Sequence, residues 1–459
     1  MKKSLILCLT GLLICSLQAA QKKPNVLLIL TDDMGYADVG FNGCADIPTP
    51  NIDSIAHNGA RFTAGYVTAP QCAPSRAGLL SGRPQNRFGR EENGIIDELG
   101  IPQNIRMFGD YMRDAGYRTG MVGKWHQGAM KGCHPLDRGF DWFYGFLPGA
   151  SYYFPKANQK TIPGILENRK PQVVTNYLTD VFGDAAIRFV AEKSDKPFFL
   201  YLAFNAPHEP MEAPEEYLKK FKHLAKPDDE PLTNRGKQID HPRQVYAAMM
   251  SCLDDNIGRI LAALKEQGLE ENTLICFLSD NGGPIFKNGS CNKPLRGHKG
   301  CVLEGGVRVP YAVQWKGTIP AGQSMDTPVS SLDLLPTSLA VAGVVPAEEL
   351  EGKSLLPLLI DSKPLSERAL FCRFPFPPWQ HNTFWEIRRG DWKLVCEADR
   401  RPHGGFTGEP GTMRLYNLAE DIGETKNLID EYPEISQQLQ KEFDALNAEL
   451  PPEHWIDKR

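Results

Sequence analysis

The segment NVLLILT, residues 25–31, is an almost continuous apolar run that ends directly at two carboxylates, Asp32 and Asp33. A run of this kind is typical of a strand that is buried on both faces of a parallel sheet. Similar short apolar runs alternate with helical patterns further along the chain, at residues 119–123, 198–204, 274–279 and 311–315. The alternation predicts an α/β fold whose central, mainly parallel sheet is flanked by helices.

The pattern changes near residue 365. Short, aromatic-rich segments then predict an antiparallel sheet, and a helical pattern follows from about residue 432 to residue 450. A chain of 459 residues is long enough to form two such units. We therefore expect a large domain over residues 21–360 and a smaller C-terminal α+β domain over residues 361–459.

Residues 1–20 predict export. Two lysines precede an apolar run from Leu5 to Leu17, and Ala19 and Ala20 follow it, which is typical of a signal peptide. The run is shorter than the roughly 20 residues that span a bilayer, so we expect a periplasmic or extracellular protein without stable membrane insertion. The formal net charge of -5 argues against a nucleic-acid partner, which would need a broad basic surface.

Reactive side chains follow four of the predicted strands. They are Asp32 and Asp33, then Lys124 and His126, then His208, and finally Asp280 and Asn281. Ligand sites of open α/β sheets lie beyond the carboxyl ends of the strands, so we expect these groups to converge at one edge of the sheet.

The acidic members of this set predict a metal site. Carboxylates that are crowded together repel one another unless a hard cation neutralises them, and oxygen ligands suit Ca²⁺, with Mg²⁺ as the second choice. The expected ligands are Asp32, Asp33, Asp280 and Asn281. Zinc is less expected, because His126 and His208 stand apart from the carboxylate pairs in the sequence.

An exported chain whose cysteines all pair in disulfide bonds should have an even number of them, and this chain has an odd number. Of the eleven cysteines, Cys8 and Cys15 lie in the apolar leader, which leaves nine. If Cys72 has another task, an even set remains for disulfide bonds, with Cys372–Cys396 and Cys291–Cys301 as pairs that are close in sequence. The alternative is that several of these cysteines stay as buried free thiols.

Residues 72–83, CAPSRAGLLSGR, resemble the signature of the formylglycine-dependent type I sulfatases. Other stretches resemble the same family in the same order: LILTDDMG (28–35), GKWH (123–126), APH (206–208), SDNGG (279–283), RGHKGCVLEGGVRVP (296–310) and LYNLAEDIGETKNL (415–428). His298 departs from the pattern, because a small residue is common before the lysine. The likeness is nearest to exported bacterial carbohydrate sulfatases.

The resemblance implies an alkaline-phosphatase-like fold and a sulfuric ester hydrolase. Cys72 would be oxidised to formylglycine by a sulfatase-maturing enzyme, and residue 72 would then join the four oxygen ligands around one Ca²⁺. The roles implied for the other catalytic residues are Arg76 to orient the hydrated aldehyde, Lys124 and Lys299 to neutralise sulfate, His208 to protonate the leaving alcohol and His126 to deprotonate the second hydroxyl.

The expected substrate is a sulfated polysaccharide or oligosaccharide, such as a carrageenan-like galactan or a glycosaminoglycan. Ser151 is a candidate contact to the sulfate group. Arg87 follows the CAPSRAGLLSGR segment closely, and Trp379 and His403 lie in two predicted loops of the smaller domain. These residues offer cationic or aromatic groups that suit sulfated sugar rings.

Two alternatives share part of this pattern. A phosphomonoester or phosphonate hydrolase of the same fold would have a similar metal edge, although a two-metal phosphatase needs a second His and Asp set that the sequence does not clearly supply. A non-catalytic carbohydrate-binding homologue would be expected to have lost part of the constellation, and no named position is missing.

Overall fold

The computed structural model describes residues 23–93, 100–156, 158–226, 229–234, 237–345, 350–375, 383–397, 399–400, 406–407 and 411–452. The predicted signal peptide lies outside the described residues. Among the residues that are described, no helix combines the length and the apolar character needed to cross a membrane.

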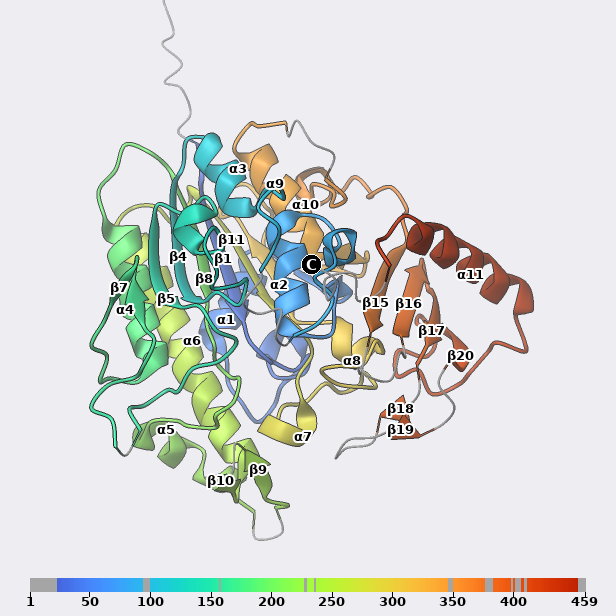
Figure 1. The fold of residues 1–459 in the computed structure, drawn as a ribbon, viewed down its shortest axis with the longest axis horizontal. Coiled ribbons are helices and arrows are strands. Elements are labelled where there is room, and N and C mark those ends of the chain that lie inside the picture. Colours follow the sequence, from blue (N-terminus) through green and yellow to red (C-terminus); the bar gives the residue numbers. More distant parts are fainter. Residues whose placement is uncertain are drawn as a thin grey trace, which may run out of the picture.

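A ten-stranded sheet forms the centre of the larger body, in the order β13-β2-β12-β11-β1-β8-β4-β5-β6-β7 (Figure 1). Its strands are β1 (Asn25–Thr31), β2 (Ala60–Phe62), β4 (Arg118–Lys124), β5 (Trp142–Phe146), β6 (Leu166–Glu167), β7 (Lys170–Pro171), β8 (Phe198–Ala203), β11 (Thr273–Ser279), β12 (Tyr311–Gln314) and β13 (Gln323–Met325). The central strands β11, β1, β8, β4 and β5 are parallel. This arrangement confirms the α/β fold that the buried apolar runs predict.

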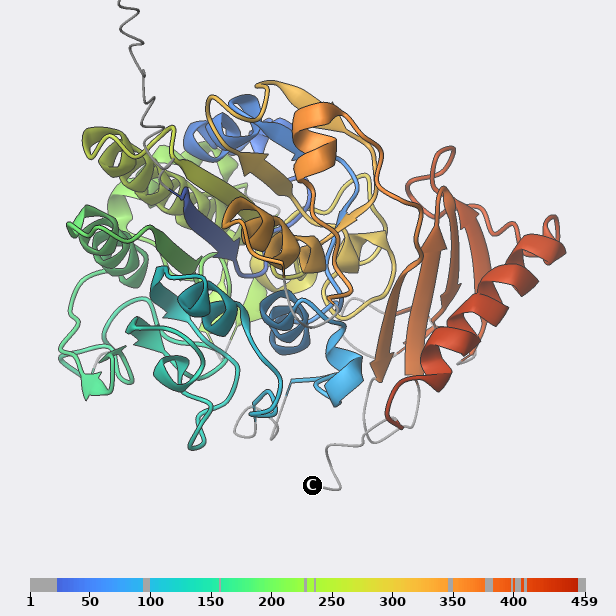
Figure 2. The ribbon, with the colours of Figure 1, turned by 90° about the horizontal axis from the view of Figure 1, so that it is seen from above.

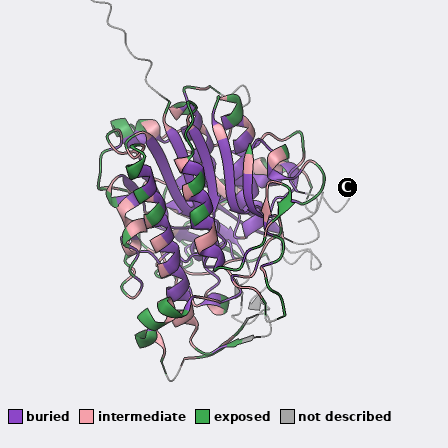
Figure 3. Ribbon diagram, turned by 90° about the vertical axis from the view of Figure 1, so that its left-hand side faces the viewer, coloured by how far each residue is buried: buried purple, intermediate pink, exposed green. Residues whose placement is uncertain are grey.

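Helices cover both faces of this sheet because neighbouring residues of each strand point to opposite sides. Leu27 and Ile29 of β1 pack in one core with α1 (Pro50–His57), α4 (Leu178–Ala191) and α6 (Pro242–Glu266). Val26 and Leu28 pack in a second core with α2 (Cys72–Ser81), α3 (Phe108–Asp114), α9 (Leu334–Val341) and α10 (Leu356–Asp361). Figure 3 shows the buried strands behind helices whose outer faces are exposed.

Short elements connect this framework. They are β3 (Gly65–Tyr66), α5 (Glu215–Lys220), β9 (Leu232–Asn234), β10 (Lys237–Ile239), α7 (Ile285–Asn288), α8 (Glu304–Val307) and β14 (Val329–Ser330). Two further short strands, β18 (Asp399–Arg400) and β19 (Phe406–Thr407), come later in the chain, after residue 396.

A smaller antiparallel sheet lies beside the larger body, in the order β15-β16-β17-β20 (Figure 2). Its elements are β15 (Leu370–Pro375), β16 (Thr383–Arg389), β17 (Trp392–Cys396), β20 (Met413–Asn417) and the final helix α11 (Pro433–Ala448). Trp385 stacks on Phe443 of α11 at 4.1 Å, so α11 covers one face. Val302 and Leu303 of the larger body cover the other face. The smaller α+β unit is thus confirmed, whereas its boundary at residue 361 stays a prediction.

The expected disulfide bonds are wrong. All nine cysteines from Cys44 to Cys396 are free thiols in the structure. Cys372 lies on β15 and Cys396 on β17, and β16 runs between them. Two strand spacings amount to about 10 Å, beyond the roughly 7 Å between Cα atoms that a disulfide bond can bridge. The odd cysteine count therefore gives no support to a special role for Cys72.

Candidate active site

The polar residues predicted at the strand ends converge at the carboxyl edge of the large sheet. Asp32 and Asp33 follow β1, Lys124 ends β4, and Asp280 follows β11. Asp33 and His126 both adopt left-handed backbone conformations, with φ of 67° and 57°. Such conformations cost free energy for residues other than glycine and cluster at functional sites, which is consistent with a site at this edge.

The helix α2 begins at Cys72, and all of its residues are buried. Asn93 connects to the start of this helix, because its Oδ1 accepts a bond from the Ala73 amide at 3.0 Å and its Nδ2 lies 3.3 Å from Cys72 Sγ. Gly78 leaves no room for a side chain, since a Cβ there would lie 2.3 Å from Thr68 Oγ1. The small residues of the CAPSRAGLLSG segment thus let the helix pack tightly behind Cys72.

Two buried carboxylates are each paired with a cation. Lys124 Nζ donates to Asp32 Oδ2 at 2.6 Å, and Arg76 Nε donates to Asp280 Oδ2 at 2.8 Å. All four side chains are fully buried. Burial and the nearby charge of Asp32 raise the pKa of Asp280 to about 6, although Arg76 opposes that shift. The low polarity of this environment makes each pairing strong and makes an unpaired charge costly.

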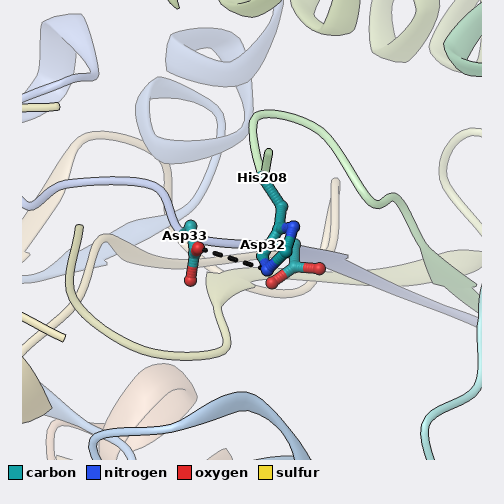
Figure 4. A group of neighbouring side chains, drawn as sticks. All are labelled: Asp32, Asp33 and His208. Carbon is teal, nitrogen blue, oxygen red and sulfur yellow. Dashed lines mark ion pairs between the residues drawn. The ribbon is translucent and has the colours of Figure 1, made fainter. Parts of the chain in front are cut away.

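A third carboxylate, Asp33, collects three partners. Its Oδ1 accepts from Lys299 Nζ at 2.6 Å and from Asn281 Nδ2 at 2.7 Å, and its Oδ2 lies 3.6 Å from His208 Nε2 (Figure 4). Burial alone would raise the pKa of Asp33, but the charges of Lys299 and His208 hold it well below its usual range. His208, which is far from these carboxylates in the sequence, reaches them because the loop after β8 folds back over Asp33.

These residues fit a hard metal ion. Ligand atoms of Asp32, Cys72 and Asp280 lie within 4.8 Å of one another, as do those of Asp32, Asp33 and His208. Two buried acceptor oxygens, Asp32 Oδ1 and Asn281 Oδ1, have no hydrogen-bond partner in the described structure. Buried acceptors are normally satisfied, and an oxygen-seeking cation would satisfy both.

Several positively charged side chains lie near Cys72. Burial alone would raise the pKa of its thiol, but Lys124, Lys299 and His126 together lower it well below its usual range. The residue also begins a helix, where the N-terminal end of the helix dipole favours negative charge. An anionic group at position 72 is therefore stabilised by its surroundings.

Ser151 belongs to the loop that packs beside His126. A Cβ atom on Gly149 would lie only 2.5 Å from His126 Nε2, so the loop passes directly over the imidazole ring. Ser151 is buried, and its Oγ lies 3.4 Å from the carbonyl oxygen of Tyr152.

Of the other three predicted substrate contacts, the structure describes only Arg87. Arg87 lies on the 3-10 helix η2 (Gln85–Phe88) and pairs with Glu351 and Glu449, both at 2.9 Å. That pairing gives Arg87 a role in holding distant parts of the chain together. Trp379 and His403 lie outside the described residues. Asn93 was not predicted, because it belongs to none of the recognised motifs and follows no strand.

Comparison with known proteins agrees with this geometry. The family model described as Sulfatase matches residues 24–344, and the model described as N-sulphoglucosamine sulphohydrolase, C-terminal, matches residues 298–449. The chain belongs to the sulfatase family. This sulfatase is a sulfuric ester hydrolase, which decides against the non-catalytic alternative.

Its relatives include enzymes and a structure with a bound carbohydrate. N-acetylgalactosamine-6-sulfatase of Mus musculus is 31% identical over 419 residues, covering 85% of this chain and 74% of that protein. Arylsulfatase A of Homo sapiens is 31% identical over 480 residues, covering 94% and 89%. The crystal structure of Ps i-CgsB in complex with k-i-k-neocarrahexaose is 33% identical, with a TM-score of 0.84 and 95% coverage of both chains.

The positive environment of Cys72 predicts an ionised thiol in sulfatase that has not been modified at this residue. Because the pKa is lowered, the thiolate should persist as pH falls below about 8.5, the usual thiol pKa. The ultraviolet absorbance difference between this protein and Cys72→Ala, followed against pH, measures the titration. Lys299→Ala should move the titration to higher pH, whereas the exposed Lys293→Ala on the same loop should not. An ordinary thiol titration at residue 72 would contradict the prediction.

Proposed function

We propose that this sulfatase removes sulfate from a sulfated oligosaccharide or polysaccharide fragment, with a formylglycine made from Cys72 as its nucleophile and one Ca²⁺ at the carboxyl edge of the sheet. The observation that carries the proposal is the position of Cys72. It begins a buried helix and lies among Lys124, Lys299 and His126, beside the oxygen ligands of Asp32 and Asp280.

Two groups that the matured enzyme would contain supply the central chemistry. Hydrated formylglycine supplies one hydroxyl to attack sulfur and a second hydroxyl whose deprotonation leads to release of sulfate. Bound Ca²⁺ supplies positive charge that polarises oxygen atoms of the nucleophile and of the sulfate group. The residues that would hold the ion are Asp32, Asp33, Asp280 and Asn281, with Mg²⁺ as the second choice.

The cations of the chain have separate tasks. Arg76 is fixed by Asp280 and by the carbonyl oxygen of Lys124, at 3.0 Å, so it can orient the group at position 72, one helical turn away. Lys124 lies against Asp32 and Lys299 lies against Asp33, and both would neutralise the sulfate oxygens. A well-placed donor of this kind contributes about 3 kcal/mol to transition-state stabilisation.

The two histidines suit proton transfer. His208 Nδ1 lies 2.7 Å from the carbonyl oxygen of Glu209, so Nδ1 carries a hydrogen and donates it. Its Nε2 lies 3.6 Å from Asp33 Oδ2 at the site, so this is the ring nitrogen that can pass a proton to the leaving alcohol. His126 is buried beside Cys72, where it can take a proton from the second hydroxyl.

A sulfated carbohydrate is the substrate class that the relatives favour. One relative is named for N-acetylgalactosamine 6-sulfate, and another was crystallised with a neocarrahexaose. We propose Ser151 as a sulfate contact, and Trp379 and His403 as contacts to neighbouring sugars. Export to the periplasm or outside the cell, and modification by a sulfatase-maturing enzyme, complete the proposal.

Formylglycine at residue 72 can be tested directly. Peptide mass spectrometry of active protein from a host with the maturing enzyme should find an aldehyde at residue 72, and Cys72→Ala should reduce turnover by at least about 10³-fold, because the nucleophile is removed. Cys44→Ser is a matched control, since Cys44 is a partly exposed free thiol outside the site. Active protein with an intact thiol at residue 72 would refute the mechanism.

The calcium site is best tested with Asp280→Asn. This change keeps the side-chain size and removes one charge, whereas Asp280→Ala would leave Arg76 buried without its carboxylate and could cost about 3–5 kcal/mol of stability. We expect a loss of bound calcium and at least a 100-fold fall in kcat, because ligands and their charges set metal affinity.

Asp333→Asn provides the matched control for that test. Asp333 is fully buried and also pairs with an arginine, Arg368, at 2.7 Å, but it lies outside the proposed metal site. It should lower the melting temperature without changing bound calcium or kcat. Full activity of the unaltered enzyme after exhaustive chelation would count against the calcium proposal.

Two kinds of sulfate ester distinguish binding of the sugar from the catalytic step. Trp379→Ala and His403→Ala should depress turnover of a sulfated oligosaccharide by about tenfold and leave a small aryl sulfate nearly unchanged, because only the oligosaccharide uses remote binding energy. Defined carrageenan, chondroitin, heparan and fucan oligosaccharides would identify the sugar. Equal losses on both kinds of ester would exclude a subsite role for these residues.

A further inference from the structure

The loop between α7 and α8, residues 289–303, contacts the site on one side and the small sheet on the other. Lys299 of this loop reaches Asp33 with its Nζ atom at 2.6 Å. Three residues later, Val302 and Leu303 are buried in an apolar cluster with Phe374 and Tyr416 of the small sheet. The position of Lys299 therefore depends on contacts with both parts of the chain.

Two carboxylates of the smaller unit hold the backbone of this loop. Glu397 Oε2 accepts a hydrogen bond from the Val302 amide at 2.7 Å, and Glu424 Oε2 accepts one from the Glu304 amide at 2.8 Å. Glu397 is 1% exposed and Glu424 is fully buried. Both are therefore committed to internal contacts, and each fixes a backbone amide within five residues of Lys299.

Two more hydrogen bonds hold the loop, one on each side of Lys299. Arg296 Nη1 donates to the carbonyl oxygen of Glu424 at 2.9 Å, so Glu424 contacts the chain on both sides of Lys299. The Gly300 amide donates to the carbonyl oxygen of Pro70 at 2.8 Å, two residues before Cys72. The loop of Lys299 is thus hydrogen-bonded both to the nucleophile segment and to the smaller unit.

The carboxylate of Glu424 is itself held by a buried cation. Lys393 Nζ of β17 lies 3.2 Å from Glu424 Oε1 and 2.8 Å from Glu304 Oε1, and all three side chains are fully buried. Glu424 also adopts a left-handed backbone conformation, with φ of 52°. A strained, buried and paired residue that contacts the loop of Lys299 indicates a position with a specific task.

We propose that Glu397 and Glu424 are positioning residues, through which the small sheet sets the place of Lys299 in the active site. The inference rests on the proposed role of Lys299 in sulfate binding. In the described structure the two glutamates bond to backbone amides of Val302 and Glu304 and to none of the other catalytic residues, so they act through the backbone of the loop. A displacement of about 1 Å at Lys299 is enough to lower the rate about 100-fold.

The test is a set of double-mutant cycles on the intact enzyme. Glu397→Ala and Glu424→Ala should each lower kcat for a small aryl sulfate by about 10- to 100-fold, and Glu397→Gln and Glu424→Gln, which keep an acceptor oxygen, should restore part of it. In a Lys299→Ala background the same changes should cost less than about twofold, because the group they position is gone. In a His208→Ala background they should keep their full effect.

Glu442→Ala is the matched control within the smaller unit. Glu442 lies on α11 and accepts a bond from Arg389 Nε at 2.8 Å, with no contact to the loop of Lys299. It should leave kcat unchanged, and melting curves identify any variant that fails to fold, for which the Gln variant is used instead.

The outcomes separate this inference from the proposed function. If Lys299→Ala leaves kcat unchanged, the proposed role of Lys299 fails and the inference falls with it. If Lys299→Ala lowers kcat but the glutamate variants lose the same factor in every background, the inference alone is overturned, because the glutamates then serve only the stability of the fold.

Discussion

Buried carboxylates can be gathered at the edge of the large sheet only because a cation lies against each of them. Asp32 has Lys124, Asp280 has Arg76 and Asp33 has Lys299. A buried charge without a partner costs several kcal/mol, so these pairs constrain the fold itself. The strand order β11-β1-β8-β4 brings the required chain ends together, and α2 must pack where Arg76 can reach Asp280. The same pairs leave oxygen atoms of Asp32 and Asn281 unsatisfied, which is the feature that a metal ion would complete.

The partners come from distant parts of the sequence, and the chain holds them in place in different ways. Lys124 is delivered by the end of a buried strand, whereas Lys299 is delivered by a loop with no regular structure of its own. A loop with a long, cationic side chain needs outside contacts to hold one conformation, since ordering each residue costs about 1–2 kcal/mol. Val302 and Leu303 provide apolar contacts of this kind, and Glu397 and Glu424 provide polar ones. The smaller unit therefore contributes to the geometry of the site.

Much of the fold could be predicted because continuous apolar runs report burial on both faces. The runs at β1, β4, β8, β11 and β12 were recognisable on that ground alone. The strand β5 (Trp142–Phe146) was missed, since its sequence WFYGF shows neither alternation nor an aliphatic run, and its strand conformation comes from pairing with β4. The expectation for Cys372 and Cys396 failed for a related reason. Sequence separation says nothing about the strand that runs between two residues in a sheet.

For the site, as for the fold, sequence patterns report local features but not contacts between residues that are distant in the sequence. Strand ends and motifs indicated which residues converge, but not which atoms meet. Strand order predicts that His208 reaches this edge but not that its ring faces Asp33. No pattern near Arg87 indicates its pairing with Glu351 or Glu449, which lie hundreds of residues later. Asn93 illustrates the limit most clearly. Its contacts with Cys72 and Ala73 depend on a chain reversal after α2 that leaves no periodic pattern in the sequence. Local pattern therefore identifies the groups that carry chemistry, whereas their pairing, on which charge balance and reactivity depend, is fixed only when the whole chain has folded.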